Sequence, residues 1–230
     1  MSAPSSLPCP LCVDAAPRFH EEHGRHFHLC AECGLVFVDP AEHPTPDAAA
    51  ARYARHQNDP RDARYRDHLA RLADPLCLKA AAGARALDYG SGPTPALAGM
   101  LRERGYQVTA WDPIYAAAPE ALVGCYDVIA CCEVVEHFRA PAREFVRLAG
   151  LLAPDGWLGV MTHLLAGPEA LPGWWYARDP THLVFYQQRT MEWLAARFCW
   201  DLESPAPDVT LFHAAPLLSG RRCTTERCCT

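Results

Sequence analysis

The sequence is short of three things: long apolar runs, positive charge and glycine at a nucleotide turn. No apolar run approaches the ~20 residues of a membrane-spanning helix, so we expect no membrane partner. The N-terminus shows no basic segment followed by an apolar one, so we expect no signal peptide and a cytoplasmic location. The formal net charge of −6 argues against a large phosphate-binding face and hence against a nucleic-acid partner.

The missing glycine concerns the turn Gly90-Ser91-Gly92, which follows a short apolar segment ending at Asp88. Pro93, Thr94 and Pro95 stand where a dinucleotide fingerprint would carry its third glycine. Thr94 can cap a following helix, with Pro95 in its first turn. Such a turn still presents backbone N–H groups to a ligand, so we predict a nucleoside site rather than an NAD site.

Strand-like and helix-like segments alternate after this turn. Strands are predicted near 85–89, 107–111, 126–132 and 157–162, and helices near 95–104 and 140–152. A helix over 190–198 and strands near 200–203 and 208–213 follow. This alternation predicts an α/β fold with a Rossmann-like, doubly wound, mostly parallel sheet. Asp112 ends the second strand, where a carboxylate can accept hydrogen bonds from both ribose hydroxyls.

Two cysteine pairs near the N-terminus have the spacing C-x2-C-x17-C-x2-C of a zinc ribbon: Cys9, Cys12, Cys30 and Cys33. Four thiolates complete a tetrahedron and leave no position for a reactant, so we expect one structural Zn²⁺ ion. Four unrelated thiols are the simpler alternative. The histidines between the pairs could substitute as ligands, or could be exposed residues of the ribbon strands: His20, His23, His26 and His28.

Four motifs occur in the order and spacing found in class I S-adenosylmethionine-dependent methyltransferases. They are Leu87–Gly92, Trp111–Pro113, Tyr126–Ile129 with Glu133–His137, and Leu152–Trp157. The chain therefore resembles that family over roughly residues 84–165. The resemblance implies S-adenosyl-L-methionine as cofactor, held by Asp88, Gly90, Gly92, Asp112, Pro113 and Glu133.

The chain divides into four predicted parts. We expect a zinc ribbon over 1–40, a linker and amphipathic helix over 41–80, the methyltransferase domain over 81–216 and a disordered tail over 217–230. Asp59 is the predicted cap of the amphipathic helix, with Pro60 in its first turn. Tyr53 and Tyr65 could line the cofactor entrance, or the helix could simply cover the sheet.

Three histidines compete as the base that would activate an acceptor: His137, His163 and His182. His182 ends an aromatic segment, Trp174–His182, at a place where acceptor pockets are built in the methyltransferases this chain resembles. We therefore place His182, His137 and Tyr176 at the acceptor. Structural roles are the alternatives, for His182 as a turn residue bonded to Asp179.

The leading functional hypothesis is methyl transfer to a small-molecule acceptor such as a sugar, a quinol-like ring or another biosynthetic intermediate. An RNA methyltransferase that docks its substrate through the ribbon is one alternative. Its local basic patch would comprise Arg18, Arg25, Arg61, Arg64, Arg66 and Arg71. A non-catalytic binding protein with a vestigial cofactor site is the other. The sequence does not predict the oligomeric state.

Overall fold

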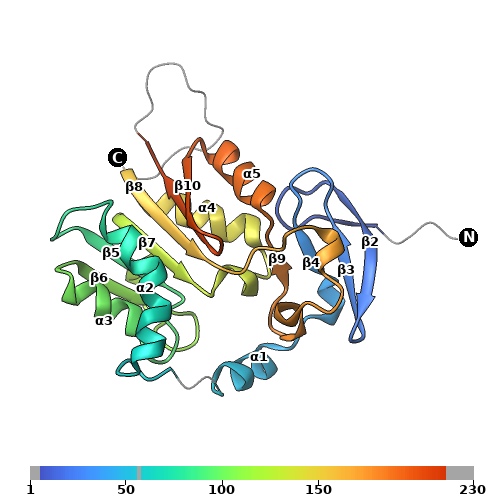
Figure 1. The fold of residues 1–230 in the computed structure, drawn as a ribbon, viewed down its shortest axis with the longest axis horizontal. Helices are drawn as coiled ribbons and strands as arrows, with labels where there is room; N and C mark the ends of the chain where they lie inside the picture. Colours follow the sequence, from blue (N-terminus) through green and yellow to red (C-terminus); the bar gives the residue numbers. More distant parts are fainter. Residues whose placement is uncertain (1–5, 56–57, 216–230) are drawn as a thin grey trace, which may run out of the picture.

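The structure is a computed structural model that describes residues 6–55 and 58–215. A six-stranded sheet with the order β10-β11-β8-β7-β5-β6 forms its centre (Figure 1). The strands are β5 (Arg85–Tyr89), β6 (Gln107–Trp111), β7 (Tyr126–Cys132), β8 (Leu152–Met161), β10 (Asp201–Ala206) and β11 (Val209–His213). The first four run parallel, and β10 and β11 form an antiparallel hairpin at one edge. The predicted α/β fold with a mostly parallel sheet is confirmed.

Four helices cover the two faces of this sheet: α2 (Ala63–Cys77), α3 (Ala96–Glu103), α4 (Pro141–Leu151) and α5 (Gln188–Phe198). Side chains alternate along each strand, so Ala86 and Val128 pack in one apolar cluster with α2 and α3. Leu87 and Ile129 point the other way, into a cluster with α4 and α5. Because β5, β6, β7 and β8 run parallel, their carboxyl ends lie along one edge of the sheet.

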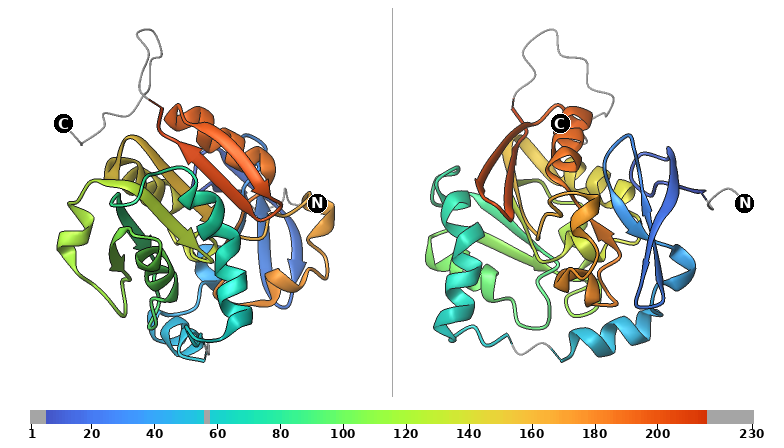
Figure 2. Two further views of the ribbon diagram at one scale, coloured as in Figure 1. Left: turned by 60° about the vertical axis from the view of Figure 1, so that its left-hand side comes forward. Right: turned by 45° about the vertical axis from the view of Figure 1, so that its right-hand side comes forward.

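A second sheet has the order β1-β2-β3-β4-β9. Its strands are β1 (Ser6–Pro8), β2 (Ala15–Glu22), β3 (Arg25–Leu29), β4 (Val36–Val38) and β9 (Val184–Phe185). The last strand comes from the far end of the chain, and Val36 pairs with Phe185 across it. Figures 1 and 2 show this late segment, in orange, running beside the blue N-terminal strands. The N-terminal unit thus shares a sheet with the segment that follows β8.

Several predicted boundaries were wrong. Asp62, not Asp59, caps α2 by accepting the N–H of Arg64 at 2.8 Å. Thr94 does not cap α3, whose N-cap is Pro95. The connector over 41–51 contains ordered helix, because α1 (Pro46–Tyr53) begins there, and β8 starts at residue 152 rather than 157.

Short 3-10 helices complete the described chain: η1 (Pro40–Glu42), η2 (Pro119–Leu122), η3 (Val135–His137), η4 (Pro168–Ala170) and η5 (Trp175–Arg178). In the described ranges, no helix is both long and apolar enough to cross a membrane. The predicted tail over 217–230 lies outside the described residues.

Candidate active site

The glycine turn lies at the carboxyl end of β5, where both glycines have left-handed backbones. Gly90 has φ +82° and Gly92 has φ +66°. The N–H groups of Gly90 and Ser91 donate to the carbonyl oxygen of Trp111, which ties the turn to the end of β6. A Cβ atom on Gly90 would lie 2.6 Å from Val134, whereas one on Gly92 would meet nothing within 4 Å. The Cα atom of Gly90 therefore packs closely against Val134, whereas Gly92 faces open space that a ligand can enter.

This difference predicts unequal effects of two matched substitutions. Gly90→Ala adds a clash to the strain of a positive φ and should lower the free energy of unfolding by about 2–4 kcal/mol. Gly92→Ala adds strain alone, worth about 1–2 kcal/mol. Denaturant unfolding of both variants measures the difference, and equal losses would contradict the packing described here.

The Asp112 carboxylate joins the glycine turn to the loop after β6. Its Oδ2 accepts the Gly92 N–H at 3.0 Å, and its Oδ1 accepts the N–H groups of Ile114 and Tyr115 at 2.8 and 3.0 Å. A carboxylate has about four acceptor sites, so three are used and one remains for a ribose hydroxyl. Pro113, exposed between Asp112 and Ile114, flanks this position.

Asp88 lies beneath the turn rather than beside it. The side chain is buried, and its Oδ2 accepts the N–H of Ala98 in the first turn of α3 at 3.0 Å. Burial raises the pKa of Asp88 to about 7. Asp88 therefore holds the helix start in place, and direct contact with a cofactor stays a prediction.

Two carboxyl groups follow β7. The Tyr176 hydroxyl donates to Glu133 at 3.1 Å, and the Thr162 hydroxyl donates to fully buried Glu136 at 3.0 Å. The two hydroxyls are 3.1 Å apart, which links the carboxyl groups through one network. Burial raises the pKa of both carboxyls, and repulsion from Glu136 raises that of Glu133 further. Glu133 also has a positive φ of 52°, which marks a sharp turn at the strand end.

His137 and His182 come together beside this network. The Nδ1 atom of His137 lies 2.8 Å from the Thr181 carbonyl oxygen, and that of His182 lies 2.8 Å from the Tyr176 carbonyl oxygen. The imidazole centroids are 4.9 Å apart, and the Tyr176 ring is 4.1 Å from that of His182. Burial lowers the pKa of His137, and lowers that of His182 to about 4. All three predicted acceptor-side residues are thus brought into one place.

The His182 backbone N–H donates to the Asp179 carbonyl oxygen at 3.1 Å, as the turn-residue alternative expects, but the Asp179 carboxylate does not bond to the His182 ring. The Asp179 carboxylate instead accepts hydrogen bonds from Thr181 and pairs with Arg52 at 2.7 Å. These contacts hold the pKa of Asp179 well below its usual range, against the opposing effect of burial. The His182 ring is oriented by a backbone carbonyl.

The four N-terminal cysteines form a compact cluster whose sulfur atoms lie within 4.8 Å of one another. Cys9 and Cys33 have Sγ atoms 3.6 Å apart, and those of Cys12 and Cys30 are 3.3 Å apart. A Zn²⁺ tetrahedron with bonds of about 2.3 Å has edges of about 3.8 Å, so the thiols fit this ion. The contact between the Cys9 and Cys33 sulfur atoms lowers the pKa of Cys9 and raises that of Cys33.

The intervening histidines take no part in this four-cysteine group among the described residues. Of the four histidines, His23 is exposed as expected and His20 and His26 are half-buried, whereas His28 is fully buried and stacks on Phe37 with centroids 5.3 Å apart. Its Nδ1 lies 3.0 Å from the Ala16 carbonyl oxygen. His28 is therefore a residue of the ribbon core.

Arg25, which the sequence analysis named only as part of a basic patch for RNA, contacts the segment that carries His182. From β3 it donates to the carbonyl oxygens of Ala177 and Asp179 at 2.9 and 3.1 Å, and also to that of His182. These hydrogen bonds attach residues 177–182 to the N-terminal sheet. Nothing local in the sequence signals such a contact, because the partners lie more than a hundred positions apart.

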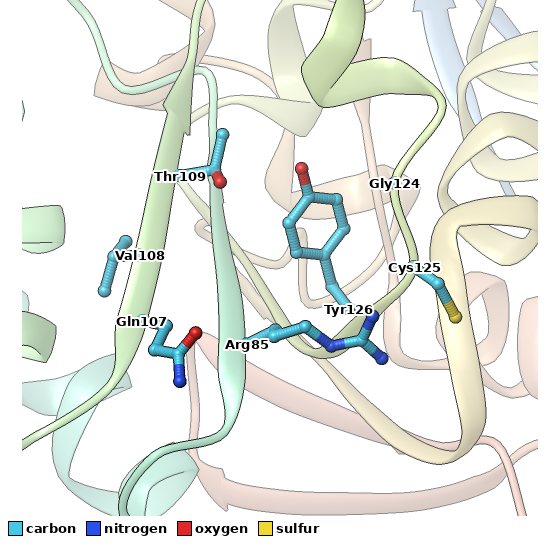
Figure 3. Close-up of a pocket in the computed structure, with 7 residues that line it drawn as sticks. All are labelled: Arg85, Gln107, Val108, Thr109, Gly124, Cys125 and Tyr126. Carbon is cyan, nitrogen blue, oxygen red and sulfur yellow. The ribbon is translucent and has the colours of Figure 1, made fainter.

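A surface hollow of about 370 Å³ lies at the opposite edge of the central sheet (Figure 3). Arg85, Gln107 and Tyr126, which begin their strands, contribute to its lining. Ligands of open parallel sheets bind outside the carboxyl ends of the strands. The hollow is at the amino ends, so it is not the candidate active site.

Comparisons with known proteins give the family and the fold of the chain. A family model described as "Methyltransferase domain" matches residues 53–204. The chain is similar to the 1,6-didemethyltoxoflavin-N1-methyltransferase of Burkholderia thailandensis, solved with 1,6-didemethyltoxoflavin and S-adenosylhomocysteine bound. Identity is 16%, coverage is 85% of this chain and 98% of that one, and the TM-score is 0.51.

A putative methyltransferase from Bacillus halodurans is 17% identical over 59% of this chain and 67% of that one, with a TM-score of 0.48. No curated protein matches the chain. At 16% identity, the Burkholderia thailandensis structure shows a common fold.

Proposed function

Because the chain belongs to the class I S-adenosylmethionine-dependent methyltransferases, we propose that it transfers the methyl group of S-adenosyl-L-methionine to a small-molecule acceptor. One observation carries the proposal. The glycine turn, Asp112, Glu133 and the aromatic segment 174–182 meet at the carboxyl edge of the parallel sheet, where such folds bind ligands.

The cofactor would occupy the space above Gly92, with its ribose at the remaining acceptor site of Asp112. Backbone N–H groups at the turn and a carboxylate after the next strand suit a nucleoside. When bound, the sulfonium supplies the methyl group and the leaving group. The protein's part is to hold the acceptor in line and away from water.

Aromatic side chains favour a small acceptor with a flat or apolar face. Trp175 is 59% exposed, although tryptophan is usually well buried, and its ring meets Tyr176 with centroids 5.3 Å apart. Such rings offer apolar walls, and the Tyr176 hydroxyl can orient a polar group. His182 would accept the proton of an acceptor hydroxyl, because its Nδ1 serves the Tyr176 carbonyl and leaves Nε2 with a lone pair.

Pairing of the basic residues supports a small acceptor over RNA. Arg61, Arg66 and Arg71 pair with Asp59, Glu103 and Asp208, while Arg25 donates to three carbonyl groups. The three ion-paired arginines contribute little to phosphate binding, and the Arg25 guanidinium keeps its charge but is occupied by carbonyl groups.

Cofactor affinity tests the nucleoside half of the site. Asp112→Ala removes a charge-assisted acceptor, a loss of about 1.5–3 kcal/mol, so affinity for S-adenosyl-L-methionine should fall about ten- to a hundredfold. Calorimetry measures the change, with exposed Glu120→Ala as the control that loses a carboxylate elsewhere. Tighter binding of NAD than of S-adenosyl-L-methionine would contradict the assignment.

The acceptor is found by incubating the protein with methyl-labelled cofactor and separate small-molecule, RNA and protein fractions of a cell extract. Label in the small-molecule fraction is the expected result. Label in RNA would reject the acceptor class while leaving the reaction in place. Cofactor binding without transfer to any fraction would reject enzymatic turnover.

A further inference from the structure

Three side chains converge on one point at the acceptor side of the site. Glu136, His137 and His182 each offer one ligand atom, and these atoms lie within 4.8 Å of one another. The Nε2 atom of His137 is 3.8 Å from the Oε1 atom of Glu136. The two imidazole rings meet edge to face, at an interplanar angle of 65°. Small side-chain rotations would let the three atoms share one ion.

Both histidines are held as metal-binding histidines usually are. Each Nδ1 lies 2.8 Å from a backbone carbonyl oxygen, that of Thr181 for His137 and that of Tyr176 for His182. A carbonyl only accepts hydrogen bonds, so Nδ1 carries the proton and Nε2 keeps its lone pair. Such outer contacts fix the tautomer and ring orientation of metal ligands.

Glu136 supplies buried negative charge without a cationic partner. Its side chain has no solvent exposure, its Oε2 accepts from Thr162, and its Oε1 has no hydrogen-bond partner. The Oε1 atom of neighbouring Glu133 is unpartnered as well. Within residues 6–55 and 58–215, neither carboxylate forms an ion pair with lysine or arginine, and only histidines approach them. A buried carboxylate without a counter-charge is costly, and a cation at this point would offset the cost.

From this geometry we infer that Glu136, His137 and His182 form a second metal site, which binds a divalent transition-metal ion such as Zn²⁺ or Co²⁺. Two imidazoles and one carboxylate suit ions of this class and leave at least one coordination position open. An oxygen ligand can take that position, whereas the four-cysteine site is closed. The inference does not depend on the identity of the acceptor.

An ion here would change what His182 does. A lone pair that binds metal no longer accepts a proton, so the ion rather than the imidazole would lower the pKa of a bound hydroxyl. His182 acts as a proton acceptor only in the metal-free enzyme.

Equilibrium dialysis of the full chain against Co²⁺ tests the site. The wild type is expected to bind two equivalents, one with the intense thiolate-to-cobalt absorption and one without it. His182→Ala should keep the first and bind the second more than about 100-fold more weakly, since loss of an outer contact alone costs up to about that much. His43→Ala is the matched control, a half-buried histidine bonded to the Val38 carbonyl and outside the cluster.

The number of Co²⁺ equivalents bound by the wild type is itself a test of the second site. A single equivalent with thiolate absorption, at Co²⁺ concentrations up to the millimolar range, would overturn the inference. Equal binding of the second ion by His182→Ala and His43→Ala would overturn it too. Because dialysis includes neither cofactor nor acceptor, failure here leaves the proposed methyl transfer untouched, and failure to find an acceptor leaves the metal site untouched.

Discussion

Replacing Cys9 with serine is expected to release the predicted zinc ion and to lower the melting temperature by about 10 °C or more. Zinc binding to such sites contributes folding free energy directly, about 10–16 kcal/mol in isolated zinc-finger peptides. Buried apolar contacts of the ribbon retain part of the fold, so we expect a net loss of several kcal/mol, at roughly 2–4 °C per kcal/mol for a chain of this size.

The loss should extend beyond residue 40. Cys30 and Cys33 immediately precede β4, which pairs with β9 through Val36 and Phe185. Residues 177–182 accept hydrogen bonds from Arg25 of the same sheet. Loosening of the ribbon should therefore reach the acceptor side, while the glycine turn and Asp112, which directly follow β5 and β6, keep cofactor binding.

Metal analysis, thermal unfolding and cofactor calorimetry measure these three effects. Cys125→Ser is the control, because this half-exposed thiol lies outside the four-cysteine group. Absence of zinc from protein purified without chelator would reject the site. A Cys9→Ser variant that melts with the wild type would reject its contribution to stability.

In the metal-free enzyme, His182→Ala should lower turnover by about 10²–10⁴-fold, the range usual for a proton-transferring side chain. Cofactor affinity should stay the same, because the ring contacts His137 and Tyr176 rather than the glycine turn. The expected signature is a fall in kcat with calorimetric cofactor binding unchanged.

Steady-state kinetics with the acceptor found in extract measures this effect, and His43→Ala serves as the control histidine. A parallel loss of cofactor affinity and melting temperature would indicate a structural role. Unchanged turnover would remove His182 from the reaction and leave His137, on the same network, as the next candidate.

Local patterns predicted the central sheet well, because burial on alternate strand residues and on helix faces repeats within a few positions. β5, β6 and β7 begin and end at the predicted residues. Helix starts were less predictable, since Asp59 and Asp62 are both sound caps and only the packing of α2 selects between them.

Long-range contacts escaped prediction for a physical reason. Arg25 meets carbonyl groups of residues 177–182, and fully buried His28 stacks on Phe37 of the neighbouring strand. Neither contact leaves a periodic trace in the sequence. The motif around Glu136 was visible, but its lack of a counter-charge could be seen only in three dimensions.

The pairing of β4 with β9 also orders events during synthesis on the ribosome. All four cysteines of the predicted zinc site lie within the first 33 residues, so they can bind their ion early in translation. The neighbouring strand, Val36–Val38, is apolar and buried in the finished protein, yet its partner emerges only at residues 184–185. Through most of translation this strand is an open sheet edge, the kind of surface that recruits other chains. The β4 edge of the nascent N-terminal unit therefore stays unpaired until residues 184–185 have been made.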